Sequence, residues 1–177
     1  MLKRISAVAL CLGIACPLAA AADDSLVKFK GGIGVIPVSS AAGTANADGT
    51  SPNVNRNVVR GVNPPGQPWV IADLRAEVKA DGSIRVRGKG LLLAGGNALG
   101  GTAGQSVFAT LICEAAAPFT LRSTSPAGVL LAPDGDFRID DMLDPAPSDC
   151  ASPVLLIRSV ALQAWFAAGI HDLGDGD

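Results

Sequence analysis

The glycine-rich segment GGNALGGT, from Gly95 to Thr102, comes within one residue of a phosphate-binding P-loop. That motif has two glycines separated by four residues, then a lysine that reaches the phosphates and a Ser or Thr, at the start of a helix. Here Gly101 occupies the lysine position, and the segment lies between two apolar runs that read as strands. We interpret it as a connection between strands, with four candidate binding residues: Gly95, Asn97, Gly101 and Thr102.

Two groups of aspartates could supply the oxygen ligands that calcium prefers. One group is Asp134, Asp136, Asp140 and Asp141, and the other is a tail with Asp172, Asp175 and Asp177. Neither has the residue order of an EF-hand loop. Turn formation by Asp134 and a solubilising tail are the alternative explanations. Calcium held by Asp134, Asp136 and Asp140 is the one cofactor hypothesis; otherwise we expect no cofactor.

Residues for other site chemistry are few. His171 is the single histidine, and a Ser-His-Asp triad that used it would lack the usual Gly-x-Ser-x-Gly elbow. Copper and zinc sites need several His or Cys ligands. Asp140 and Asp141 are neighbours in a predicted strand, so their side chains point to opposite faces. We predict no catalytic residue, and a hydrolytic enzyme that uses the Asp-rich loops is the alternative.

Residues 1–22 have the pattern of a secretory signal peptide, in which Lys3 and Arg4 precede a short apolar run and a small-residue end. The apolar run is too short for a transmembrane helix, and no later segment qualifies. We therefore expect a secreted or periplasmic protein. A lipid attached at Cys16 is the competing interpretation. Removal of the leader would change the formal net charge from −2 to −4, which argues against a nucleic-acid partner.

The four cysteines divide into two pairs. Cys11 and Cys16 belong to the predicted leader, whereas Cys113 and Cys150 lie in the remaining chain. Two cysteines in an exported protein predict one disulfide. The absence of a Cys-x-x-Cys motif argues against a catalytic thiol pair.

A clear period-two pattern covers residues 69–89 and predicts a hairpin. A three-residue turn, Ala80-Asp81-Gly82, keeps apolar residues on one face, because it sets Val78 opposite Ile84 and Ala76 opposite Val86. On the outer face this register sets charged residues opposite one another: Glu77 and Arg85, Asp73 and Lys89, Arg75 and Arg87. We interpret that face as a solvated sheet surface.

A second turn of the same type, Pro133-Asp134-Gly135, predicts a hairpin with Leu131 opposite Phe137 and Val129 opposite Ile139. Four further segments complete the pattern: one or two edge strands in 25–38, a long loop in 39–57, a central strand in 105–114 and two strands in 154–170. Propensity alone would also allow a helix in the last of these.

The predicted fold is an all-β, antiparallel two-sheet β-sandwich with one disulfide. Residues 23–68 would hold the N-terminal strands and a polar loop rich in Gly, Asn and Pro. The sandwich core would span residues 69–171, followed by an acidic tail at 172–177.

Several segments together resemble a group of uncharacterised exported bacterial proteins: GGIGVIPV, PPGQPWVIADLRAEV, GLLLAGGN, GDFRID, PVLLIR and WFAAGI. The resemblance covers most of the chain after the leader. It implies a shared fold and export, and no activity.

Aromatic residues make up 4% of the chain and include no Tyr, which argues against a surface that stacks sugars or bases on aromatic rings. We therefore expect an exported, non-enzymatic β-sandwich that binds a partner or associates with itself through loops such as 95–104. The alternative is a calcium-dependent module or hydrolytic enzyme that uses the Asp-rich loops.

Overall fold

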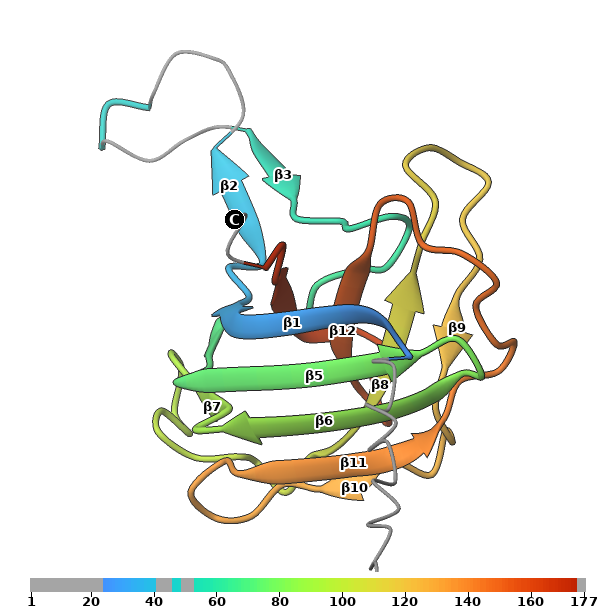
Figure 1. The fold of residues 1–177 in the computed structure, drawn as a ribbon. Helices are drawn as coiled ribbons and strands as arrows, with labels where there is room; N and C mark the ends of the chain where they lie inside the picture. The colour runs from blue at the N-terminus through green and yellow to red at the C-terminus, as the bar shows by residue number, and fades with distance from the viewer. Residues whose placement is uncertain (1–23, 41–45, 49–52, 175–177) are drawn as a thin grey trace, which may run out of the picture.

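The computed structural model describes residues 24–40, 46–48 and 53–174, which form strands, turns and loops (Figure 1). The strands are β1 (Ser25–Gly34), β2 (Val38–Ser40), β3 (Val54–Arg56), β4 (Trp69–Val70), β5 (Asp73–Lys79), β6 (Ser83–Lys89), β7 (Leu92–Leu93), β8 (Ser106–Ile112), β9 (Arg122–Ser123), β10 (Val129–Leu130), β11 (Phe137–Met142), β12 (Val154–Ser159) and β13 (Trp165–His171). These residues contain no helix that could span a membrane. The all-β prediction is confirmed, and the predicted leader at 1–22 lies outside the described residues.

Nine strands form one antiparallel sheet instead of the two sheets that we expected. Its order is β10-β8-β12-β13-β1-β5-β6-β11, and β9 also pairs with β8. The two end strands meet at the turn that joins them, where Ala132 N donates a hydrogen bond to Asp136 O at 3.0 Å. The sheet therefore curls into a nearly closed barrel, so the hydrogen bonds do not divide it into a sandwich.

Irregularities within the strands explain why the sheet curls. The register of β1 shifts between Ser25 and Val27 and again between Phe29 and Gly32. Such bulges bend a strand and increase its twist. At the end of β1, Gly34 allows β4 to pass close by, since a Cβ on Gly34 would lie 2.1 Å from Trp69 O. Hydrophobic alternation in the sequence does not reveal this curvature.

The hairpin of β5 and β6 has the predicted register. Val78 lies opposite Ile84 and Ala76 opposite Val86, and all four side chains are buried. Gly82 completes the three-residue turn with a φ of 89°, a conformation that glycine adopts without strain. Local sequence information was sufficient here because the two strands are joined by a short turn.

The second predicted hairpin forms only at its turn, where Gly135 N donates to Ala132 O at 2.8 Å. Beyond this turn the two strands separate, and β10 pairs with β8 while β11 pairs with β6. Val129 consequently lies opposite Val107, and Ile139 lies opposite Val86. The predicted pairs of Leu131 with Phe137 and Val129 with Ile139 were therefore wrong, because the turn sits at the seam of the barrel.

The other predicted segments had mixed outcomes. β8 lies inside the sheet and is buried on both faces, as expected for a central strand. Residues 154–170 form the strands β12 and β13, so the strand interpretation is confirmed over the helix. β1 is not an edge strand, because β5 and β13 flank it. The predicted loop 39–57 contains part of the β2–β3 pair; its residues 41–45 and 49–52 lie outside the described residues.

The barrel interior contains one hydrophobic core. Trp69 stacks on Phe166 with ring centroids 4.0 Å apart, at one end of this core. The largest fully buried side chains come from all around the sheet: Phe166, Leu74, Ile84, Leu91, Leu111, Ile112, Leu155, Leu156 and Ile157. Burial of each contributes about 1.5–3 kcal/mol.

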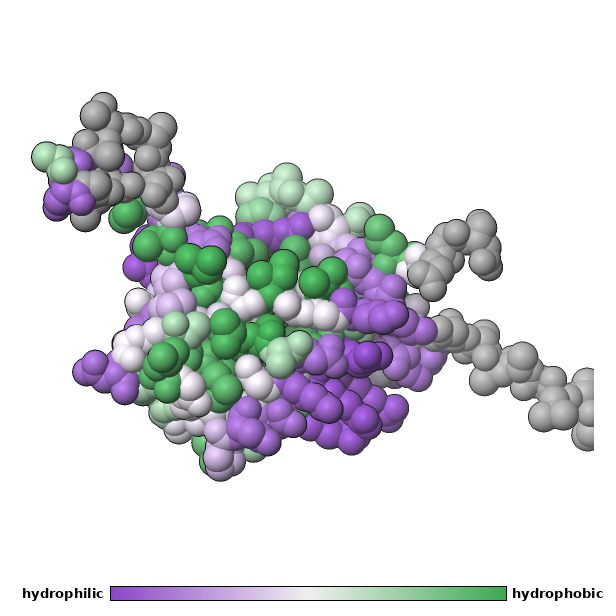
Figure 2. All heavy atoms as spheres, turned by 90° about the vertical axis from the view of Figure 1, so that its left-hand side faces the viewer, coloured by the Kyte–Doolittle hydropathy of each residue, from purple (hydrophilic) through white to green (hydrophobic). Residues whose placement is uncertain are grey.

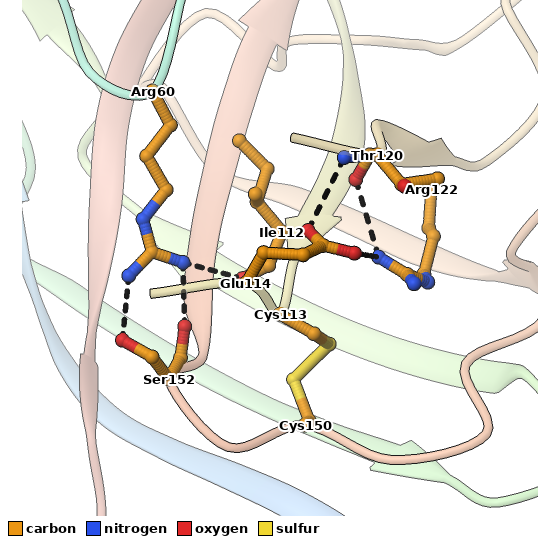
Figure 3. The surroundings of a disulfide bond; sticks show 8 residues. All are labelled: Arg60, Ile112, Cys113, Glu114, Thr120, Arg122, Cys150 and Ser152. Atoms are coloured by element: carbon orange, nitrogen blue, oxygen red, sulfur yellow. Dashed lines mark hydrogen bonds and ion pairs between the residues drawn. A yellow bond between two sulfur atoms is a disulfide. The ribbon is translucent and has the colours of Figure 1, made fainter. Parts of the chain in front are cut away.

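The predicted disulfide joins Cys113, next to the end of β8, to Cys150 in the loop before β12 (Figure 3). Arg60 reinforces the same junction from a third segment. Its Nη1 donates to Ile112 O at 3.0 Å and its Nη2 to Ser152 Oγ at 2.6 Å. The bridge and this arginine together hold the loop against β8.

A charged pair lies beside the disulfide. Arg122 Nη1 donates to Glu114 Oε1 at 2.8 Å, and Thr120 N donates to Glu114 Oε2 at 3.2 Å (Figure 3). Burial opposes ionisation of Glu114, but these hydrogen bonds outweigh it and lower its pKa to about 2. The pair closes residues 114–122 into a compact loop.

Replacing both Cys113 and Cys150 with Ala should lower the free energy of unfolding by about 4 kcal/mol, because the bridge closes a loop of 37 residues. Urea denaturation of the oxidised protein and the double variant measures this difference. Intact mass after alkylation, with and without prior reduction, verifies the bridge. Two alkylated thiols in the unreduced protein would contradict it.

The Glu114 pair predicts a loss of stability in acid. The pKa is about 2 in the folded chain and 4.5 as an unperturbed value, so the stabilisation is complete above pH 4.5 and disappears as the pH falls toward 2. Glu114→Gln should remove this component and flatten the dependence of unfolding free energy on pH in that range. Parallel curves for the two proteins would show that the pair contributes nothing.

Candidate functional site

The glycine-rich segment 95–104 is a loop between β7 and β8. Gly100 N donates to Leu93 O and Leu93 N donates to Gly101 O, both at 2.9 Å, which folds the loop back onto β7. β8 follows it, so no helix dipole supports phosphate binding there. Of the four candidate binding residues, Asn97 is exposed, and Gly95, Gly101 and Thr102 are partly buried.

The same loop borders an apolar surface that sequence reasoning missed. Leu99 is 68% exposed, and Val70, whose strand β4 pairs with β7, is 50% exposed. Figure 2 shows hydrophobic side chains gathered on this side of the molecule, the left side of Figure 1. Exposed apolar surface of this kind is common at protein contacts.

The candidate calcium ligands have separate partners. Asp134 Oδ1 accepts a hydrogen bond from Asp136 N at 3.1 Å, which is the turn role considered for it, and Asp136 Oδ1 accepts one from Gly90 N at 3.0 Å. Asp140 instead contacts Arg85 and Arg138. Within the described ranges, no three His, Cys, Asp or Glu side chains are grouped to hold a metal ion.

His171 lies at the end of β13, with its ring 6.0 Å from that of Phe29. Asp172 N donates to Lys28 O at 2.9 Å and fixes this end of the strand. In the part of the chain that the structure describes, no hydrogen bond links the imidazole to a serine or a carboxylate. The arrangement therefore offers no catalytic triad.

The most distinctive chemical feature is a line of four cations across the outer face of the barrel. Lys30 on β1 lies opposite Arg75 on β5, Arg75 opposite Arg87 on β6, and Arg87 opposite Arg138 on β11. All four side chains are exposed. Directly opposed residues of antiparallel strands share a face and lie about 5 Å apart. We call these four residues the cation row.

The rows on either side of the cation row contain both signs of charge. On one side Lys28, Glu77, Arg85 and Asp140 alternate in sign across the same four strands. On the other side Asp73 lies opposite Lys89. The unbalanced positive charge is therefore confined to a narrow line, in a chain whose formal net charge is −2.

The cation row is poorly neutralised. Arg75 Nε lies 3.4 Å from Asp73 Oδ2, and Arg138 Nη2 lies 3.2 Å from Asp140 Oδ2. Both pairs are largely exposed, and such pairs are worth only about 0–1 kcal/mol. Within the described residues, Lys30 and Arg87 form no ion pair. The row therefore keeps three opposed pairs of like charge, although such pairs destabilise a sheet.

A hollow of about 360 Å³ lies over β1, β5 and β6 along part of this row. Its charged lining comes from the cation row, from the adjoining mixed row and from Asp172 after β13: Lys28, Lys30, Arg75, Glu77, Arg85, Arg87 and Asp172. Figure 2 shows a hydrophilic region at lower right, which corresponds to the front face of these strands in Figure 1. The hollow gives a ligand access to several cations at once.

Only half of the cation row could be predicted from the sequence. The β5–β6 hairpin predicted that Arg75 faces Arg87, but we interpreted the face as solvated surface. Lys30 and Arg138 join the row because β1 and β11 pair with the outer sides of this hairpin. The alternation in KFK and FRID is compatible with an outward position for both side chains, but it does not reveal that they lie beside the hairpin.

Comparisons of the chain with protein-family models, with curated proteins and with solved structures found no match. The resemblance to exported bacterial proteins consequently stays a prediction.

Arg87→Gln should raise the free energy of unfolding by about 0.5–1 kcal/mol at low salt, because it removes two opposed like-charge contacts. The gain should shrink as salt screens the remaining charges. Urea denaturation at low and high salt measures both effects. Arg85→Gln is the matched control, since it loses contacts of opposite sign and should lower stability; equal destabilisation by both variants would refute the repulsion.

Proposed function

We propose that this protein is an exported, non-enzymatic binding module whose cation row holds an acidic polysaccharide. The observation that carries the proposal is the direct opposition of Lys30, Arg75, Arg87 and Arg138 on four consecutive strands. An anionic polymer laid along this line relieves the mutual repulsion of the four cations. The arrangement therefore gains stability when the ligand is bound.

The geometry of the cation row favours a linear ligand. Neighbouring strands are about 4.8 Å apart, so the row extends about 14 Å across three strand spacings. An extended polysaccharide with one carboxylate on each sugar repeats its charge at a similar interval. The flanking carboxylates of Glu77, Asp73 and Asp140 would repel a broad polyanion but leave a narrow one in contact with the cations.

Charge is the recognition chemistry that this surface offers. Neutral sugars and single-stranded bases bind mainly through exposed aromatic rings, and the residues that line the hollow include one aromatic, the buried Phe29. A duplex nucleic acid would place phosphates over the flanking acids as well as over the cations. An acidic polysaccharide needs no aromatic ring to bind, and it can contact the cations without placing charge over the flanking acids.

Export is supported by two features. The predicted leader would direct the chain out of the cytoplasm, and the Cys113–Cys150 disulfide suits an oxidising compartment. A secreted or periplasmic location would bring the protein into contact with acidic cell-surface polymers.

Two earlier hypotheses stay alternatives. A calcium-dependent module or hydrolytic enzyme would use Asp134, Asp136 and Asp140, whose carboxylates have separate partners. A contact with a protein, or with a second copy of the chain, would use the loop 95–104, where the exposure of Leu99 favours it.

The double variant Arg75→Gln/Arg87→Gln should bind polygalacturonate roughly tenfold more weakly than the wild type, because two exposed charge contacts of about 0.5–1 kcal/mol are lost. Isothermal titration calorimetry at low ionic strength measures the affinity. Rising salt should weaken wild-type binding, and dextran, which is uncharged, should not bind.

The matched control is Lys79→Gln/Lys89→Gln, which removes the same charge from the same outer face but leaves the cation row and the lining of the hollow intact. Its affinity should stay close to that of the wild type. Equal losses in the two double variants would reduce the effect to net charge and refute the row as a site. Preference for an oligonucleotide or for anionic lipid vesicles over polygalacturonate would refute the ligand class.

A further inference from the structure

A second hollow, of about 580 Å³, lies over β8, β9, β12 and the end of β11. Arg158 on β12 lies opposite Phe108 on β8, and both side chains line this hollow. The volume falls in the range of sites for small molecules. This hollow shares no residue with the cation row, so it is independent of the proposed function.

Arg158 is an unusual residue to find here, because it is only 8% exposed and has no acidic partner among the described residues. Its Nε and Nη2 donate to Gln163 O at 3.1 and 2.8 Å, and its guanidinium lies 5.0 Å from the centre of the Phe108 ring. In the described part of the chain, no carboxylate lies within ion-pair distance of it. Burial lowers the pKa of Arg158, which reflects the cost of a buried charge with neutral partners.

Arg158 keeps one nitrogen available for a ligand. Nη1 has a single contact, 3.4 Å from Thr110 Oγ1, whereas a guanidinium has five N–H donors. A carboxylate is the group that a guanidinium binds best, through charge-assisted hydrogen bonds. A ligand carboxylate at this point would neutralise the buried charge.

The remaining lining combines two carboxylates, two exposed apolar side chains and several neutral polar residues. Asp141 is already engaged, because its Oδ2 accepts from Ser125 N and its Oδ1 from Met142 N, both at 2.8 Å. Asp144 is exposed, and no hydrogen bond or ion pair involves its side chain among the described residues. Leu121 and Met142 add partly exposed apolar surface at 40% and 51%. These carboxylates disfavour phosphate or another purely anionic ligand.

We propose that this hollow binds an apolar free amino acid. The ligand carboxylate pairs with Arg158, its ammonium group pairs with Asp144, and its side chain packs against Leu121 and Met142. The guanidinium, the Asp144 carboxylate and the two apolar side chains then each meet a group of matching chemistry, and the buried guanidinium gains an anionic partner.

The probes are L-leucine, L-methionine and L-phenylalanine, together with two fragments of leucine. Isocaproate lacks the ammonium group, and isopentylamine lacks the carboxylate. NMR titration of the purified protein should show saturable binding of at least one amino acid, with shifts of the Leu121 and Met142 methyl groups. Isocaproate and isopentylamine should each bind at least about tenfold more weakly than leucine, because each loses one charged contact.

Two variants test the assigned contacts. Arg158→Gln should weaken amino-acid binding by about ten- to a hundredfold. Asp144→Asn, at an exposed position, should weaken amino-acid binding about tenfold but leave isocaproate binding unchanged. Lys89→Gln, which lies outside both this hollow and the cation row, should change the affinity for neither the amino acid nor isocaproate and serves as the control.

Binding of none of the three amino acids overturns the proposal. So does equal affinity of the wild type and Asp144→Asn for the best of them, which remains measurable even if Arg158→Gln fails to fold. Tighter binding of isocaproate than of leucine would exclude the ammonium contact and with it the amino-acid class.

Discussion

The inner-face packing of β5 and β6 is the constraint on which the outer surface depends. Val78 must lie opposite Ile84, and Ala76 opposite Val86, for the apolar side chains to face the core. Because side chains alternate along a strand, a shift by one residue would expose that whole apolar set. The same register obliges Arg75 to face Arg87. The like-charge contact is thus a consequence of the register that core packing imposes.

The barrel topology extends that contact into the cation row. β1 pairs with β5 and β11 pairs with β6, and each supplies one cation at the matching position. A sequence free of functional demand could place an acid at either position, as it does in the adjoining row with Asp140. The four-cation line therefore has a cost in stability that the exposed pairs of Arg75 with Asp73 and Arg138 with Asp140 offset only weakly, and such local conflicts are commonest at functional sites.

The sequence predicted features that depend on neighbours in the chain and missed those that depend on distant pairing. The β5–β6 register and the turn at Gly135 follow from local residue types. The partners of β10 and β11 do not follow from local residue types, because strands far along the chain can pair with either edge. In the structure, β10 pairs with β8 and β11 pairs with β6. One curled sheet replaced the expected sandwich for a related reason, since bulges in β1 set the curvature and leave little trace in hydrophobic alternation. The disulfide was predictable because removal of the predicted leader leaves two cysteines, Cys113 and Cys150.

Arg158 illustrates the limit most clearly. In PVLLIR, Arg158 comes directly after the apolar residues 154–157. A charge near the end of an apolar strand normally marks the point where the chain reaches solvent. The structure instead covers it with β9 and its flanking loops and leaves it with the carbonyl of Gln163 and the ring of Phe108. Replacing such a buried charge by an apolar residue is often neutral or stabilising, so stability alone gives no reason for an arginine at this position. The hollow beside it gives one, because a bound carboxylate converts the cost of burial into affinity.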